Sequence, residues 1–223
     1  MYLRRQQFEG SVGESFFLWG ARQTGKSTLL KKLYPDSIWF DLLHNDVFER
    51  FQRNPSQLRE IIMASQPEKP VVIDEIQKIP ALLDEIHWLI ENTQTRFILS
   101  GSSPRKIIRS QANLLGGRAL RYELFPLSTE IPDFDLLRAL NNGLLPRHYL
   151  SDNPQKMISA YIGNYLQDEI LAEARIRNVS SFARFLEIAA FSNGEMVNYT
   201  NIASECGVSA PTIKEYFQIL ADT

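Results

Sequence analysis

The chain has 223 residues, of which 44% are hydrophobic and 22% charged, so it can bury one large α/β core with a smaller appendage. The formal net charge of −2 excludes a global attraction to nucleic acid or to an anionic membrane. A single cysteine excludes an intramolecular disulfide, and no apolar run reaches the roughly 18 residues of a membrane span. Because the N-terminus also lacks a signal peptide, we expect a cytoplasmic protein without membrane contact.

Five short apolar segments, rich in aromatic and branched residues, alternate with helical segments in the first half of the chain. The predicted strands are residues 15–19, 37–42, 70–74, 96–100 and 120–125. The predicted helices between them include residues 55–66, 80–93 and 108–119. This alternation indicates an α/β fold with a doubly wound parallel sheet, and we assign this domain to residues 1–130.

The pattern changes after a Pro-containing connector, and residues 131–223 show only helical periodicity. They predict a second, all-helical domain. Its last part, residues 198–220, predicts two short helices around Gly207 at helix–turn–helix spacing, with Ser209 as N-cap of the second helix. The sequence stops shortly after this helix, and we expect it to be a piece of a longer protein.

The strongest motif lies between the first predicted strand and a helix. The sequence G-A-R-Q-T-G-K-S matches the phosphate loop G-x-x-x-x-G-K-[ST] at every fixed position. Its glycines let backbone N–H groups point at phosphate oxygens, and the next helix directs its positive end at the same anion. Lys26 can reach the β and γ phosphates, and the Ser27 hydroxyl can bind Mg²⁺. The residues expected to bind nucleotide are Gly20, Ala21, Arg22, Gln23, Thr24, Gly25, Lys26, Ser27 and Thr28.

Two acidic residues end the third predicted strand, in the segment V-V-I-D-E-I-Q. Asp74 is placed to hold Mg²⁺, and Glu75 to polarise an attacking water as a general base. A strand-ending turn is the alternative interpretation of this pair. Ser100, at the end of the fourth predicted strand, is a candidate for binding the γ phosphate or the water, as are Ser102 and Ser103.

The charge that spreads over a transferred phosphoryl group also requires an arginine. Arg118, near the end of a predicted helix, is the first candidate, either in its own subunit or as an arginine finger from a neighbouring one. The second arrangement would require self-association. Arg22 and Arg105 are weaker candidates, and a solvated side chain is the alternative for each.

The segments GARQTGKSTLL, VVIDEIQKIP, FILSGSS, GGRALRYELFPLS and NYTNIASECGVS together resemble the prokaryotic AAA-type P-loop ATPases of the AAA_14 group. The resemblance implies a five-stranded parallel sheet with an additional strand between the phosphate-loop strand and the Asp74 strand. It also implies Mg²⁺-dependent ATP hydrolysis by Lys26, Ser27, Asp74 and Glu75. A winged-helix segment usually follows the core in this group, and the usual C-terminal domain has no counterpart in these residues.

Three functions are compatible with these features. The first is an ATPase that acts as a nucleotide-driven switch. The second is a nucleotide-responsive DNA-binding regulator that uses the helix–turn–helix segment. Against it, the second helix of this segment offers Lys214 beside Glu215 and little else to contact phosphates. A lid over the nucleotide or a surface for a partner is the alternative interpretation of the segment. The third is a small-molecule kinase. The choice of ATP over GTP follows from the resemblance alone, because the loop binds phosphates and not the base.

Overall fold

The computed structural model describes residues 13–104, 107, 115–165 and 179–222, and all structural statements below concern these residues. The chain forms two compact units, Met1–Leu150 and Ser151–Thr223.

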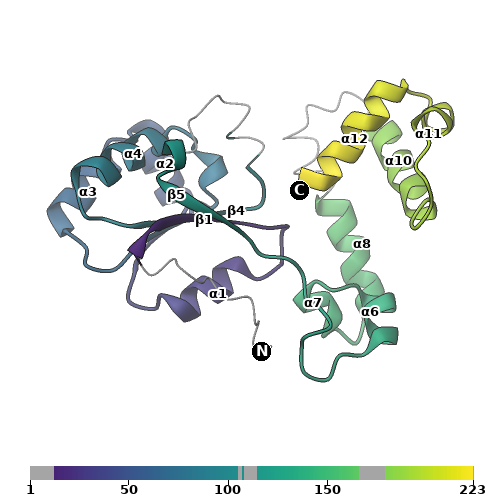
Figure 1. Cartoon of the computed structure of the whole chain (residues 1–223), viewed down its shortest axis with the longest axis horizontal. Coiled ribbons are helices and arrows are strands. Elements are labelled where there is room, and N and C mark those ends of the chain that lie inside the picture. Colours follow the sequence, from purple (N-terminus) through teal and green to yellow (C-terminus); the bar gives the residue numbers. More distant parts are fainter. Residues whose placement is uncertain (1–12, 105–106, 108–114, 166–178, 223) are drawn as a thin grey trace. The chain divides into compact units, whose positions relative to one another are not determined.

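The first unit is built on a parallel five-stranded sheet (Figure 1). Its strands are β1 Ser15–Trp19, β2 Ile38–Asp41, β3 Val71–Asp74, β4 Phe97–Gly101 and β5 Ala119–Glu123. The order across the sheet is β2-β3-β4-β1-β5, and each neighbouring pair is parallel. β4 therefore lies between β1 and β3, which confirms the additional strand. The carboxyl ends of β1, β3 and β4 meet at one edge of the sheet.

Helices cover both faces of this sheet, as a parallel sheet requires. The helices of the first unit are α1 Lys26–Leu33, α2 Asn45–Arg53, α3 Gln57–Ser65, α4 Leu82–Asn92, α6 Leu136–Asn142 and α7 Pro146–Tyr149, with short 3₁₀ turns η2 Ile76–Lys78 and η3 Leu115–Gly117. The second unit contains α8 Pro154–Tyr165, α10 Val179–Phe191, α11 Tyr199–Cys206 and α12 Ala210–Asp222. None of the helices in the described part of the chain is long and apolar enough to cross a membrane.

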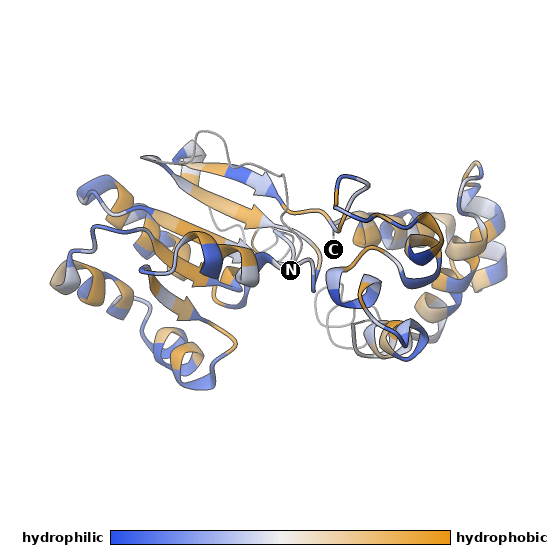
Figure 2. Ribbon diagram, turned by 90° about the horizontal axis from the view of Figure 1, so that it is seen from below, coloured by the Kyte–Doolittle hydropathy of each residue, from blue (hydrophilic) through white to orange (hydrophobic). Residues whose placement is uncertain are grey.

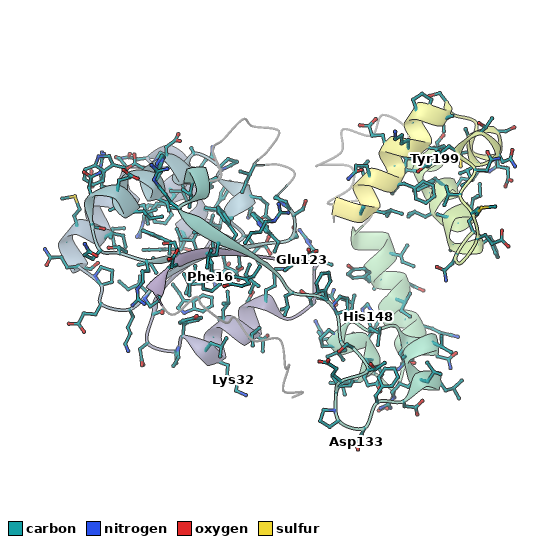
Figure 3. The ribbon with its side chains drawn as sticks, viewed as in Figure 1. Phe16, Lys32, Glu123, Asp133, His148 and Tyr199 are labelled. Carbon is teal, nitrogen blue, oxygen red and sulfur yellow. The ribbon has the colours of Figure 1, made fainter. Side chains whose placement is uncertain are left out.

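Alternate side chains of β1 supply two separate cores. Phe17 and Trp19 belong to the larger core, on the face covered by α2, α3 and α4. Phe16 and Leu18 belong to a second core with Leu30 of α1. Figure 3 shows Phe16 on the side of the sheet where α1 lies. The residues of β1, β3 and β4 are consequently buried along the whole of each strand. Most of the strand segments are orange, the colour of hydrophobic residues, in Figure 2. This double burial keeps β1, and the loop that follows it, in a fixed place.

The predicted strands agree with the observed ones within one residue at each end, except that β5 ends two residues earlier. The sequence prediction did not identify α2, whose buried Phe51 packs edge-to-face against Phe40 of β2. Most of the helix predicted at 108–119 lies outside the described residues. Its last residues form η3 and the first residue of β5.

The segment after β5 has a small apolar cluster of its own. Leu127, Ile131 and Tyr149 are buried together, with Phe134 stacked on the Tyr149 ring. The Tyr149 hydroxyl accepts a hydrogen bond of 2.8 Å from the Asp135 N–H, the residue that caps α6. These contacts hold α6 and α7 against the connector. Both helices belong to the compact unit that ends at Leu150, although the change in sequence pattern comes near residue 131.

The second unit has a core formed by α10, α11 and α12. Phe182, Phe185 and Tyr216 are buried in mutual ring contact. Gly207 ends α11 with φ +67°, the left-handed conformation that glycine adopts readily at a helix C-terminus. The Ser209 hydroxyl accepts a hydrogen bond from the Thr212 N–H in the first turn of α12, which confirms the predicted N-cap.

The phosphate loop packs closely at Gly20 against Leu124, the residue after β5, and a substitution of Gly20 tests this packing. A Cβ at Gly20 would lie 2.3 Å from the Leu124 carbonyl oxygen, and φ at this position is +152°. We expect Gly20→Ala to lower the free energy of unfolding by about 2 kcal/mol or more, because backbone atoms must move. Urea denaturation followed by circular dichroism measures the change.

Gly13→Ala is the matched control, since a Cβ at Gly13 meets nothing within 4 Å. Equal stability of the Gly20→Ala and Gly13→Ala proteins would contradict the packing described here.

Candidate functional site

The phosphate loop connects the carboxyl end of β1 to the first residue of α1. Gly25 immediately precedes α1 and has φ +94°, a left-handed conformation that favours glycine. The Thr24 side chain is buried, and its hydroxyl donates a 2.9 Å hydrogen bond to the Ala21 carbonyl oxygen. The loop is therefore held by its own side chains, with the N-terminal end of α1 directly behind it.

Lys26 lies across this loop with only 5% of its surface exposed. Its Nζ donates hydrogen bonds to the carbonyl oxygens of Gly20 at 2.6 Å and Ala21 at 3.1 Å. Gly20 and Ala21 thus hold the ammonium group through their carbonyls, and the ammonium stays beside the loop amides. A buried cation at the N-terminal end of a helix favours the binding of an anion there.

Asp74, at the end of β3, is 3% exposed and collects hydrogen bonds from three elements. The Ser27 hydroxyl of α1 donates to Oδ2 at 2.5 Å, and the Ser100 hydroxyl of β4 donates to Oδ1. The Glu75 N–H also donates to Oδ1, at 3.1 Å. These bonds compensate for the loss of water around a buried carboxylate.

Ser27 and Asp74 fit a magnesium ion. Mg²⁺ prefers oxygen ligands and usually takes one or two from the protein, with water and phosphate oxygens completing its shell. A hydroxyl and a carboxylate oxygen 2.5 Å apart, at the edge of a phosphate loop, supply such a pair. The Ser100 hydroxyl donates to Oδ1, the other carboxylate oxygen of Asp74, and so holds the Asp74 side chain in place.

Glu75 follows Asp74 and is partly exposed. Burial raises the pKa of its carboxyl group; the Lys26 ammonium opposes this rise, and the Asp74 carboxylate adds to it. A raised pKa makes a carboxylate a better proton acceptor. The Glu75 backbone has φ 61° and ψ 42°, a left-handed conformation that is unfavourable for a residue with a Cβ. Unfavourable backbone conformations of this kind concentrate at functional sites.

A cavity of about 430 Å³ is lined by Lys26, Ser27 and Glu75 among others, and its size suits a small-molecule ligand. Its lining consists of residues 22–29 and Glu75, and of four residues from the segment after β5: Leu127, Pro146, Arg147 and Leu150. The sequence prediction did not include these four. No motif marks them, because they reach the cavity only through the packing of α6 and α7 against the connector.

The AAA domain family AAA_14 matches residues 13–131, which is more than half of the chain. The chain belongs to this family. A second family, described as a domain of unknown function (DUF8612), matches residues 133–223. A search of curated proteins gives no match.

One solved structure agrees with the AAA_14 assignment at the level of the fold. The Walker-type ATPase PABY2304 of Pyrococcus abyssi has a TM-score of 0.50 at 13% identity, and the alignment covers 91% of this chain and 83% of that one. At this identity the likeness shows the fold alone.

Arg118 of this AAA_14 domain lies away from the phosphate loop. It precedes β5, at the end of the sheet where β1 begins, and a strand length of about 16 Å separates it from the loop. It forms an ion pair with Glu91 at the surface. The structure therefore does not bring Arg118 to the cavity of its own subunit, and a role in a neighbouring subunit stays a prediction.

Arg22 and Arg147 are the arginines that line the cavity among the described residues. Arg105 lies outside the described residues. In the second unit, Lys214 and Glu215 are both exposed on α12, so their charges offset each other there. DNA binding through this segment stays a prediction.

The strain at Glu75 predicts an unusual order of stabilities. Removing the Cβ relieves the backbone strain of a residue in the left-handed conformation. We therefore expect the free energy of unfolding of Glu75→Gly to be about 1 kcal/mol higher than that of Glu75→Ala. The same pair at Glu60, inside α3, is the control. There glycine should be less stable than alanine by about 1 kcal/mol, as in any helix.

Urea denaturation of the four variants measures both differences. If the glycine variant is the less stable one at both positions, the left-handed backbone at Glu75 carries no strain.

Proposed function

We propose that the chain binds Mg-ATP and hydrolyses it, and that the change from ATP to ADP reorganises the helices that follow the sheet domain. The hydrogen bond between Ser27 and Asp74 is the observation that carries this proposal, because it joins the phosphate loop to the acidic strand end. Glu75 lines the same cavity as the loop. Membership of the AAA_14 family supports ATP as the nucleotide.

In this proposal, the loop amides and the Lys26 ammonium bind the β and γ phosphates. Lys26 would exchange a carbonyl partner for phosphate oxygen at little cost, since it stays beside the loop. Ser27 and Asp74 would hold the magnesium ion, which neutralises charge on the phosphates when bound. Arg22, which lines the cavity, adds a second cation.

Glu75 has the chemistry of the general base. Its carboxylate accepts a proton from water as the water oxygen forms a bond to the γ phosphorus. The bond between that phosphorus and the bridging oxygen breaks, and ADP keeps the electron pair. The protein positions these groups and stabilises the charge, as in other phosphoryl transfers.

The other end of the cavity suits the base and connects the site to the helices. Leu127, Pro146 and Leu150 give it an apolar surface on which a flat ring can lie. Leu150 is also the residue before Ser151, where the second compact unit begins. A nucleotide that contacts Leu150 can therefore favour one conformation of this junction, which supports the proposed switch.

Two substitutions separate binding from hydrolysis. We expect Lys26→Ala to weaken Mg-ATP binding by about 100-fold, because a charge-assisted contact to phosphate is lost. We expect Glu75→Gln to leave binding intact and to slow phosphate release by about 100-fold or more, because glutamine cannot accept the proton. Calorimetry measures the binding and a phosphate-release assay the turnover. Equal turnover by both variants and the unmodified protein would refute the proposal.

Leu150 tests the position of the base. We expect Leu150→Ser to weaken ATP binding by about fivefold, the effect of losing one apolar contact with the base. Inorganic tripolyphosphate, which has no base, should bind equally well to this variant and to the unmodified protein. Leu140→Ser is the matched control, because Leu140 is a leucine of α6 that is 75% exposed and does not line the cavity. If Leu150→Ser weakened the binding of ATP and of tripolyphosphate equally, Leu150 would not contact the base.

A further inference from the structure

Gln77 is a buried polar residue next to the site that the proposed mechanism does not use. It lies in η2, the turn that follows Glu75, and is 3% exposed. Its side-chain nitrogen Nε2 donates hydrogen bonds to the Glu75 carboxylate and, at 3.1 Å, to the Ser102 hydroxyl. Gln77 is not among the described residues that line the cavity, so it reaches the site only through Glu75.

The orientation of the Gln77 amide is determined by Glu75. An ionised carboxylate only accepts hydrogen bonds, so the NH₂ group and not the carbonyl must face it. At the other end of the amide, the buried Oε1 has no hydrogen-bond partner among the residues that the structure describes. A buried carbonyl without a partner costs stability. The contact with the Glu75 carboxylate therefore determines which end of the amide faces the site.

Gly101 makes room for this amide. A Cβ at Gly101 would lie 2.2 Å from Gln77 Oε1 and 2.6 Å from the Trp19 ring. Any larger residue at the end of β4 would push the glutamine or the tryptophan aside. The last residue of β4 thus allows Gln77 to bridge the space between η2 and this strand.

The end of β4 then supports both Asp74, the last residue of β3, and Glu75, the residue that follows it. Ser100 bonds directly to Asp74, and Ser102 is linked to Glu75 through Gln77. Glu75 is partly exposed and could otherwise adopt several side-chain rotamers. A general base must point at its water within a narrow range of positions, so restricting these rotamers increases turnover.

We propose that Gln77 is a positioning residue that holds the Glu75 carboxylate in the direction required for hydrolysis and couples it to the end of β4. This inference rests on the proposed ATPase function. Gln77 contacts neither nucleotide nor metal in this account, so its loss changes turnover and not binding.

Gln77→Met removes both donors and keeps the length of the side chain. We expect this variant to have a kcat lower by about tenfold or more, because Glu75 is no longer held in place. Its Kd for Mg-ATP, measured by calorimetry, should equal that of the unmodified protein. In a Glu75→Gln background, the same substitution should cause no further loss, since the group that it positions is absent.

Lys78→Met is the matched control. Lys78 is the neighbouring residue of η2, and its Nζ donates a hydrogen bond of 2.8 Å to the Leu42 carbonyl oxygen. Its side chain therefore stabilises the turn, and its backbone N–H, which bonds to the Glu75 carbonyl oxygen, is kept in the variant. We expect Lys78→Met to lower the Tm while keeping its kcat. If Lys78→Met loses kcat as Gln77→Met does, the effect is one of turn stability and the positioning role is wrong.

Three other results would overturn the inference. A Gln77→Met protein with normal kcat excludes a role in turnover, and one whose Kd rises together with a fall in kcat indicates general disruption of the site. An equal loss in the Glu75→Gln background shows that Gln77 acts independently of Glu75. A lack of phosphate release by the unmodified protein is distinct from all of these, because it refutes the ATPase function itself and with it the role of Gln77.

Discussion

The buried carboxylate of Asp74 is the group on which the geometry of the site depends. It accepts hydrogen bonds from the first turn of α1, from β4 and from the next backbone amide. Since a buried carboxylate without donors is costly, the fold must bring these elements to one point to be stable. These hydrogen bonds thereby fix three parts of the site relative to one another: the phosphate loop, the acidic end of β3 and the end of β4.

The parts of this arrangement with a local signal could be predicted from the sequence. β1, β3 and β4 are short apolar segments, and the glycines of the phosphate loop stand at fixed spacing, so their order along the chain predicts the sheet and the site edge. Asp74 and Ser27 could be paired for the same reason, because both follow from motifs whose chemistry is known. α2 was missed because its apolar residues stand among many charged ones.

The remaining parts depend on contacts between segments far apart in the chain. Pro146, Arg147 and Leu150 reach the cavity only because Tyr149 packs on the connector, and no local pattern records that packing. The position of Arg118 depends on the register of β5 with β1, which places it at the far end of the sheet. The link from Gln77 to Glu75 likewise requires Gly101 on a separate strand.

The central claim is that the loop and Asp74 form one socket for a triphosphate and its metal. Calorimetric titration of ATP into the unmodified chain and into Asp74→Asn, each with and without Mg²⁺, tests it most directly. The account predicts that Mg²⁺ strengthens binding to the unmodified chain by about tenfold or more, and that Asp74→Asn loses most of this gain. Equal strengthening by Mg²⁺ in both proteins, or no binding of Mg-ATP to a folded unmodified chain, would contradict it.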